Sequence, residues 1–343
     1  MKRVLNTLYV TSPGAYLKKE GEAVAVKVGG EIKLRVPTIS IGSIVCFGDA
    51  FLSPTLMGHC AKNGVSVSFL SAYGRFLARL EGATAGNVLL RREQYRLSDD
   101  RPRAVCIARS VVAAKIANCR SVILRALRDH GEHIKAEEAS RAAEVLRCCA
   151  DAALSERDLD RLRGIEGDAA RTYFGIFNDL ILTQKADFCF ADRNRRPPMD
   201  RVNALLSFVY TLLYHDIRSA LETTGLDPAV GFLHRDRPGR MSLALDLMEE
   251  MRPFIAERLV LSLINLRQID QKDLKVSETG AVLLADAGRK IVISAYQRRK
   301  QDPITHPYLS EEMYIGILIQ TQALLLARCI RGDIDGYPAF IWK

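Results

Sequence analysis

The chain has 343 residues, 48% of them hydrophobic and 26% charged, which is the composition of an ordinary globular protein. No apolar run reaches the length of a membrane-spanning helix, and the first ten residues, MKRVLNTLYV, are too polar for a signal peptide. Six of the eight cysteines are dispersed, Cys148 and Cys149 are adjacent, and none forms a CxxC pair, which excludes a disulfide scaffold. We therefore expect a cytoplasmic protein with free thiols, no zinc and no membrane contact.

The formal net charge is +9, and this excess of Lys and Arg favours an acidic partner, with nucleic acid the first candidate. Basic residues gather in three clusters, RNRR (193–196), RDRPGR (235–240) and GRK…QRRK (288–300). Solvated surface charge would explain any one of these clusters. Three of them in a basic chain make nucleic-acid binding as good an interpretation as surface charge.

The N-terminal part of the sequence is typical of β-structure. Its β-branched runs are interrupted by KKEGE and VGGE, which are hairpin signals. A short helical pattern and a further strand follow these runs. The expected strands are 5–10, 15–28, 29–47 and 65–70, with a helix at 53–64.

Beyond residues 90–100 the apolar residues recur at helical spacing. This period predicts helices at 103–130, 137–154, 159–182, 200–225 and 242–266. The last sixty residues combine a short stranded segment (275–285) with a final helix (311–332). The sequence thus predicts an α+β fold, with a small N-terminal β-domain (residues 1–92) followed by a larger, mostly α-helical C-terminal domain (residues 93–343).

Three acids stand inside one of the predicted helices, in the sequence SLALDLMEEMRP. We expect Ser242 to be its N-cap and Pro253 to kink or break it. Asp246, Glu249 and Glu250 share one face at helical spacing, while their neighbours are apolar. Like charges so placed repel one another. The acids either line a solvated helix face or converge on a metal ion, which would turn that repulsion into binding.

Two further residues can complete such a site. His234 precedes the acidic helix at the end of GFLH, where it is either a metal ligand or an ordinary structural histidine. Glu166 lies in a helical pattern between Gly164 and Gly167, and interior glycines destabilise a helix by about 0.5–1 kcal/mol each relative to alanine. They indicate either the close approach of a backbone or ligand, or a helix crossing or break beside a solvent-facing acid.

One imidazole with two or three carboxylates suits Mg²⁺ or Mn²⁺ better than zinc. Such cations polarise phosphoryl oxygens and activate an attacking hydroxyl. In a basic chain, this donor set points to phosphodiester chemistry on nucleic acid.

Three motifs together resemble a known family: GIEG (164–167), RRPPMDRVNALLSFVYTLL (195–213) and GFLH…GR.SLALDLMEEMRP (231–253). In this order and spacing they are similar to the CRISPR-associated integrase of the adaptation machinery, the "Cas one" family. The likeness covers nearly the whole chain, including its β-then-α order. It is nearest to members of type I systems, with subtype C favoured.

The resemblance implies a metal-dependent DNA endonuclease and integrase that joins 3′-hydroxyl ends of short duplex DNA to the CRISPR repeat by transesterification. It implies Glu166, His234 and Glu249 as ligands of Mg²⁺ or Mn²⁺, with Asp246 a nearby catalytic acid. Glu250 remains a competing ligand assignment. The implied partners are double-stranded DNA (spacer precursor and repeat) and the small "Cas two" protein. Two homodimers, formed through the N-terminal β-domains, would flank a dimer of this small partner.

Arginines around the site are suited to holding DNA phosphates. Asn203 and Ser207, one helical turn apart, either support the site or are ordinary packing residues. Two other functions stay open at this stage, a metal-dependent nuclease that does not integrate and a non-catalytic basic DNA-binding scaffold. The candidate phosphate-binding residues are Arg193, Arg195, Arg196, Arg235, Arg237 and Arg240.

Overall fold

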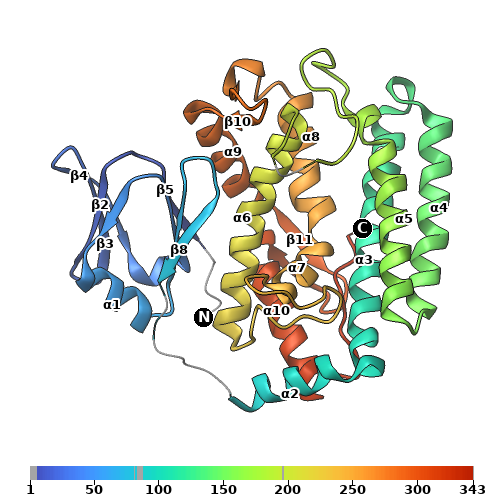
Figure 1. Cartoon of the computed structure of the whole chain (residues 1–343), viewed down its shortest axis with the longest axis horizontal. Helices are drawn as coiled ribbons and strands as arrows, with labels where there is room; N and C mark the ends of the chain where they lie inside the picture. The colour runs from blue at the N-terminus through green and yellow to red at the C-terminus, as the bar shows by residue number, and fades with distance from the viewer. Residues whose placement is uncertain (1–5, 81, 83–87, 195–196, 343) are drawn as a thin grey trace.

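A computed structural model describes residues 6–80, 82, 88–194 and 197–342 of the chain. A β-rich N-terminal region lies against a larger helical body, which confirms the predicted α+β fold (Figure 1). Within the described residues, no helix is both long and apolar enough to cross a membrane.

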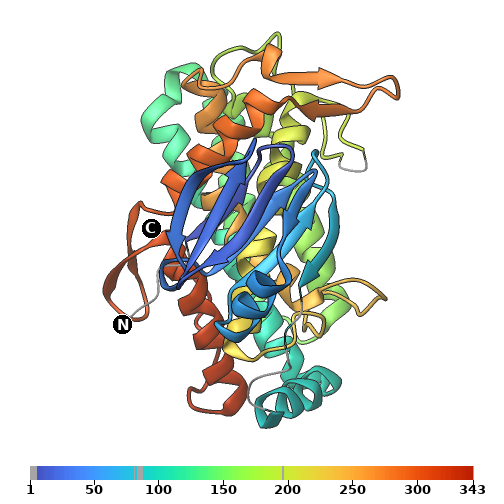
Figure 2. The same cartoon turned by 90° about the vertical axis from the view of Figure 1, so that its left-hand side faces the viewer.

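The β-region consists of two four-stranded sheets, seen from their side of the molecule in Figure 2. The first has the order β1-β5-β7-β8, parallel except for β8, and the second has the order β4-β3-β2-β6. Positive φ angles at Gly21, Gly29 and Gly30 form the two turns that the hairpin signals predict. The elements are β1 (Thr7–Val10), β2 (Ala15–Glu20), β3 (Ala23–Val28), β4 (Glu31–Pro37), β5 (Ser43–Phe47), β6 (Ala50–Leu52), α1 (Pro54–Lys62), β7 (Ser66–Leu70) and β8 (Phe76–Leu80).

The helical body follows the predicted order, with differences at several elements. The helix predicted over 159–182 ends at Gly175 and is followed by a 3-10 turn, Phe177–Leu180. Residues 90–100 lie largely in a helix, α2, so the predicted division between residues 92 and 93 falls inside it. Helix α9 was not expected, and the final helix begins at Ile315 because the preceding residues form strand β12. The helices are α2 (Val88–Asp99), α3 (Arg101–His130), α4 (Ala136–Ser155), α5 (Leu159–Gly175), α6 (Arg201–Thr224), α7 (Ser242–Glu249), α8 (Arg258–Asn265), α9 (Asp286–Arg299) and α10 (Ile315–Arg331), with hairpins β9 (Leu274–Val276)–β10 (Val282–Leu284) and β11 (Pro303–His306)–β12 (Glu311–Tyr314).

The helix predicted over 242–266 is interrupted as its proline indicates. Between α7 and α8 the backbone adopts a π-helical turn, Arg252–Glu257. Pro253 has no N–H to donate to the carbonyl one turn earlier, so the regular ladder stops just after the acids. Such turns are frequent at functional sites.

A buried polar cluster joins the β-region to the helical body. Asp216 of α6 accepts a hydrogen bond from the Thr7 hydroxyl at 2.9 Å and from the Tyr296 hydroxyl at 2.9 Å. The Lys300 ammonium donates to the same carboxylate at 2.7 Å, and both charged side chains are almost fully buried. These bonds link β1, α6 and the end of α9, and so fix the sheets against the helices.

Candidate metal site

The histidine of GFLH is held by the first acid of α7. The Asp246 carboxylate accepts backbone N–H groups of Phe232, Leu233 and His234 at 2.6, 2.9 and 3.0 Å. It also lies 2.6 Å from His234 Nδ1. With Nδ1–H donated to Asp246, the other ring nitrogen, Nε2, is left as a lone-pair donor. Asp246 therefore orients the imidazole, and its oxygens are occupied by these bonds.

A glycine makes this close approach possible. A Cβ at Gly231 would stand 2.6 Å from Asp246 Oδ2 and 2.8 Å from the Ser242 carbonyl carbon. The expectation that Ser242 caps α7 is wrong, because Met241 is the N-cap and provides no side-chain bond. The Ser242 hydroxyl instead donates to the Arg235 carbonyl at 3.2 Å and ties the loop to the helix.

The carboxylates of Glu166 and Glu249 meet at a lysine. Lys115, in the middle of α3, forms ion pairs with Glu166 of α5 and with Glu249 Oε2 of α7, the latter at 2.7 Å. Helices α3 and α5 run side by side in Figure 1. His234 Nε2 lies 3.8 Å from Glu249 Oε1. The structure thus brings together all three residues that the resemblance implies as metal ligands.

The electric field at this cluster keeps Glu249 ionised. Burial by itself would raise the pKa of Glu249, but the positive charges of Arg252 and Lys115 outweigh it and lower the pKa to about 2. Arg252 Nη1 lies 3.0 Å from Glu249 Oε1. Sequence reasoning missed Lys115 and Arg252, although a lysine inside the apolar run SVVAAKIANC was a detectable signal.

The glycines around Glu166 leave space. A Cβ at Gly164 or Gly167 would meet no other group within 4 Å, so the close approach of a backbone and the glycine-lined helix crossing are both wrong interpretations. The helix break is wrong as well, because α5 continues through both glycines. The Glu166 side chain keeps 27% of its exposure, against 3% for Glu249. A ligand can therefore reach Glu166 from outside, while Glu249 is covered.

Glu250 turns away from this cluster. Its carboxylate accepts bonds from the Tyr337 hydroxyl at 2.5 Å, Gln322 Nε2 at 3.1 Å and the Phe340 backbone N–H at 2.6 Å. Burial raises the pKa of Glu250 to about 7, an increase that these three bonds partly offset. This residue fastens the C-terminal segment to α7, and the geometry favours Glu249 over Glu250 as a ligand.

Two arginines share one aromatic ring beside the site. The guanidinium groups of Arg193 and Arg252 lie 5.3 and 5.1 Å from the centre of the Tyr210 ring. Arg193 also bonds to Asn203 and to Ser207, in the latter case at 3.2 Å. Of the two interpretations of Asn203 and Ser207, the structure favours support, because both position this arginine.

The remaining predicted arginines are spread over the loop after His234. Arg235 and Arg237 are exposed, whereas Arg240 is partly buried. Arg235 pairs with Asp160 at 2.7 Å, at the edge of a hollow of about 430 Å³ that Arg101, Arg157 and Arg163 also line. Arg195 and Arg196 lie outside the described residues.

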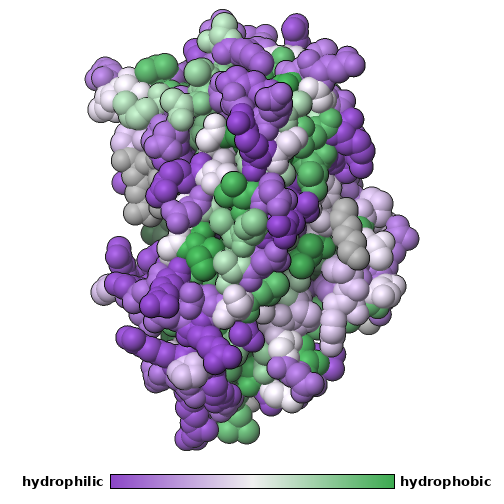
Figure 3. Space-filling model, turned by 90° about the vertical axis from the view of Figure 1, so that its right-hand side faces the viewer, coloured by the Kyte–Doolittle hydropathy of each residue, from purple (hydrophilic) through white to green (hydrophobic). Residues whose placement is uncertain are grey.

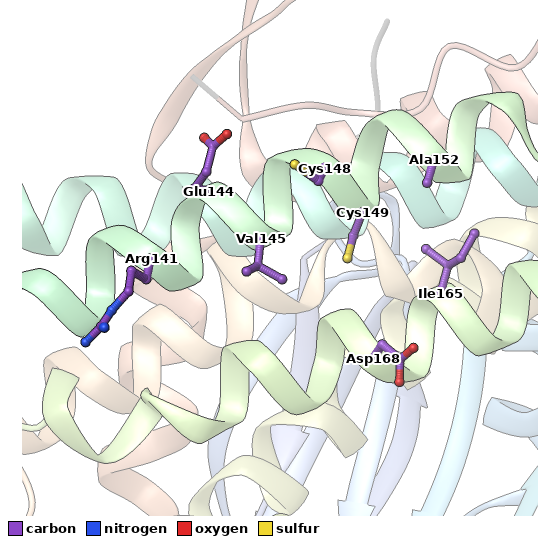
Figure 4. Close-up of a pocket in the computed structure, with 8 residues that line it drawn as sticks. All are labelled: Arg141, Glu144, Val145, Cys148, Cys149, Ala152, Ile165 and Asp168. Atoms are coloured by element: carbon purple, nitrogen blue, oxygen red, sulfur yellow. The ribbon is translucent and has the colours of Figure 1, made fainter.

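A second cavity, of about 610 Å³, has a different character. It lies between α4 and α5 and is mainly apolar, with Val145, Cys149 and Ile165 turned into it (Figure 4). The adjacent Cys148 points away from Cys149, as a helix requires. On this face hydrophobic side chains stand among hydrophilic ones (Figure 3). None of the candidate ligands lines this cavity, so it is a gap between two packed helices and not part of the candidate metal site.

Whether the cluster suits a divalent cation depends on its donors. Among the described residues, no three His, Cys, Asp or Glu side chains are grouped as a ready-made metal site, and Lys115 stands between the carboxylates. Glu249 Oε2, although 2.7 Å from the ammonium, is buried without a bond of hydrogen-bonding geometry. Mg²⁺ or Mn²⁺ would use donors of this kind. The cluster offers two carboxylates around a cation, one of them with an unsatisfied oxygen, and an imidazole that an acid orients.

Fold and site together define an α+β protein whose helical body gathers an imidazole and two carboxylates at one cationic position. The family model for "CRISPR associated protein Cas1" matches residues 8–298. The chain therefore belongs to the Cas1 family, which confirms the resemblance found from its motifs.

Individual relatives agree with this family. "CRISPR-associated endonuclease Cas1 1" of Chlorobaculum tepidum is 53% identical over 343 residues, with both chains covered completely. Among solved structures, "Casposase bound to integration product" is similar at a TM-score of 0.82 and 21% identity, covering 99% of this chain and 95% of that one. A chain of the "Cas6-RT-Cas1--Cas2 complex" is similar at 0.82 and 22% identity, covering 99% of this chain and 36% of that one. At these identities the two structures support the fold.

Proposed function

We propose that the protein is a metal-dependent DNA endonuclease and integrase of CRISPR adaptation, which joins 3′-hydroxyl ends of short duplex DNA to the repeat array by transesterification. The observation that carries the proposal is the meeting of Glu166 and Glu249 at one cation, with His234 Nε2 facing Glu249. The Cas1-family relative named an endonuclease and the likeness to a casposase bound to an integration product support it. We place this activity in the cytoplasm.

The residues would share the chemistry as follows. Glu166, Glu249 and His234 would hold Mg²⁺ or Mn²⁺, which when bound activates a hydroxyl nucleophile and stabilises charge on the phosphate. Asp246 keeps the proton on His234 Nδ1, so that Nε2 stays available as a donor. Arg252 lies beside Glu249, and Arg193 shares the Tyr210 ring with it. These two arginines would orient the phosphates that flank the reacting one.

We propose double-stranded DNA and the small "Cas two" protein as partners. The solved complex whose title names Cas1 and Cas2 supports this pairing for a chain of the same fold. In the proposed assembly two homodimers of this chain flank a dimer of the partner. Several arginines by His234 would follow the DNA backbone, Arg235 among them.

The outer face of the second sheet is suited to the homodimer contact. Tyr16 and Phe51 are neighbours across β2 and β6, on the face opposite the buried Leu17, and are 41% and 59% exposed. Phe51→Asp should convert a dimer to a monomer in light scattering, while Leu324→Asp, at an exposed position on α10, should leave it dimeric. Equal masses for the two variants would exclude this face.

The function is tested by a joining assay. The protein, its small partner, Mn²⁺ or Mg²⁺, a short duplex with free 3′-hydroxyls and a supercoiled repeat-bearing plasmid are incubated together. We expect metal-dependent joined product from the wild type and none from His234→Ala. Cutting of DNA without joining would favour a metal-dependent nuclease that does not integrate. DNA binding without metal-dependent chemistry would leave only the non-catalytic DNA-binding scaffold. If His234→Ala joins as well as the wild type, the site assignment is wrong.

A further inference from the structure

Lys115 is buried within the proposed metal site, and its role there is not accounted for by the proposed reaction. Its ammonium contacts Glu166 and Glu249, two of the three proposed ligands. We infer that Lys115 occupies the cation position when no metal is bound, and that the divalent ion must displace its ammonium in order to bind. Lys115 is then a positioning residue that sets the metal affinity of the site. The inference rests on the proposed function.

The contacts make lysine and metal mutually exclusive. The carboxylates that Lys115 pairs with are those that would coordinate the ion, and the Lys115 side chain is only 10% exposed. Arg252 already neutralises part of the charge on Glu249 at 3.0 Å. With two carboxylates against Lys115 and Arg252, this set of four charges sums to zero. A divalent ion added without displacement would lie directly against a buried ammonium, which low-dielectric surroundings strongly disfavour.

The surroundings permit this displacement. The Glu166 side chain is 27% exposed, so an ion can reach this ligand from solvent. The Lys115 side chain has four rotatable carbons, so its ammonium can withdraw while α3 stays in place. In the metal-free protein the same ammonium prevents the two carboxylates from repelling each other.

The chain contains a matched control. Lys300 is also buried and paired with a carboxylate, at 2.7 Å from Asp216. There Thr7 and Tyr296 complete the bonding of the acid, and no proposed ligand takes part. Removing Lys300 should therefore weaken the fold without altering the metal site.

The test is a calorimetric titration of the metal-free full-length protein with Mn²⁺. We expect Lys115→Met to bind Mn²⁺ at least about tenfold more tightly than the wild type, because the competing cation is gone. Without metal its melting temperature should fall, and Mn²⁺ should raise it by more than it raises that of the wild type. Lys300→Met should melt lower but bind Mn²⁺ with wild-type affinity. Unchanged or weaker Mn²⁺ binding by Lys115→Met would overturn the inference.

A second measurement uses the wild type and so does not depend on how a variant folds. A buried, paired ammonium should give a slowly exchanging ¹⁵N–¹H signal in NMR. The signal is assigned to Lys115 by its loss in Lys115→Arg. If that variant does not fold, selective ¹⁵N labelling of lysine and contacts with protons of α5 give the assignment. Saturating Mg²⁺ should abolish the Lys115 signal and leave that of Lys300 unchanged. Persistence of the Lys115 signal with Mg²⁺ bound would overturn displacement.

The proposed function and this inference fail differently. If the wild type binds no Mn²⁺, or if Glu249→Gln binds it equally well, the metal site itself is wrong and the inference falls with it. If Glu249→Gln loses Mn²⁺ but Lys115→Met gains nothing, only the role of Lys115 is refuted.

Discussion

Two buried lysines of this protein neutralise carboxylates in different ways. At the contact between the β-region and the helices, Lys300 and Asp216 are 4% and 3% exposed, and hydroxyls of Thr7 and Tyr296 complete the bonding of the acid. At the candidate site, Lys115 is shared between two carboxylates that come from different helices.

The second cluster is less complete than the first. Glu249 Oε2 and Arg252 Nε are buried there without hydrogen-bond partners. The comparison teaches that burial of charge serves two purposes in one chain. The fully bonded cluster of Lys300 and Asp216, the closed cluster, fixes one arrangement. The cluster of Lys115, Glu166 and Glu249, the open cluster, keeps one unsatisfied carboxylate oxygen at a cost in stability, and we propose that this prepares it to exchange its cation.

The largest effect should come from breaking the open cluster at its buried acid. Glu249→Gln removes a charged donor and should lower the joining rate at least about a thousandfold, equivalent to about 4 kcal/mol. Its neighbour provides the control: Glu250→Gln should lower stability through its bonds to Tyr337 and Phe340 but keep Mn²⁺ binding. Single-turnover joining assays on both variants check this. Equal loss of metal binding in both would mean that the two acids were wrongly distinguished.

Breaking the closed cluster should act on stability alone. Lys300→Met leaves Asp216 buried without its ion-pair partner, which typically lowers the free energy of unfolding by about 3–5 kcal/mol. Urea unfolding followed by circular dichroism measures the change. A loss below about 1 kcal/mol would show that the cluster does not hold the β-region in place.

A substitution in the loop that orients His234 should have an intermediate effect, on metal affinity. In Gly231→Ala the new methyl group collides with Asp246 Oδ2, so the carboxylate must move away from the imidazole. Disturbing such an orienting carboxylate typically lowers metal affinity about 10–100-fold. Gly239→Ala, in the exposed part of the same loop, places its methyl group against no neighbouring atom. Its φ of +74° should lower stability, but the variant should keep the affinity. Calorimetry with Mn²⁺ compares them, and equal affinities would contradict the orienting role.

A pH effect on stability is expected from His215, the neighbour of Asp216 in α6. Burial, with the charge of Arg218, lowers the pKa of His215 to about 4, and its ring stacks on Phe76 of β8. Because the unfolded chain binds this proton at about pH 6.5 and the folded one only near pH 4, stability falls as the pH drops through that window. From pH 7 to 5 this histidine should account for a loss of about 2 kcal/mol.

The control for that effect is His215→Phe, whose unfolding free energy should fall less between pH 7 and 5 in the same urea titrations. A variant as pH-sensitive as the wild type would show that His215 is not the group responsible.

The smallest effect is expected at the exposed rim. Arg235→Ala removes one phosphate contact and should lower the slope of log DNA affinity against log salt by about one unit, with little change in Mn²⁺ binding. Fluorescence anisotropy at several salt concentrations measures the slope. An unchanged slope would exclude Arg235 from the DNA path.

Local patterns were sufficient to predict much of the fold and the site. Helical period and hairpin glycines predicted the β-then-α order, and Pro253 predicted the break after α7. Glu166, His234 and Glu249 were found by motif. Which of two adjacent acids faces the site was not predictable, because Glu250 is bound by Phe340 and Tyr337, far along the chain.

Lys115 and Arg252 are the two site residues that the motifs do not include. The partners of Lys115 come from other helices, and no local period encodes such contacts. Arg252 lies three residues after Glu249, a helical spacing at which an ion pair is predictable, so this contact was within reach of the sequence. The motif GFLH does not reveal why position 231 must be glycine. The reason is the Asp246 carboxylate, fifteen positions later, which leaves no room for a Cβ at Gly231.

The central claim is that Glu166, His234 and Glu249 hold one divalent cation in the place now taken by the Lys115 ammonium. Crystals of the full-length protein soaked in Mn²⁺ and measured at the manganese absorption edge test it most directly. We predict an anomalous peak bound by the two carboxylates and by His234 Nε2, with Asp246 still on Nδ1 and Lys115 displaced. A manganese peak at Asp246 or Glu250, or no peak among these residues, would contradict the account.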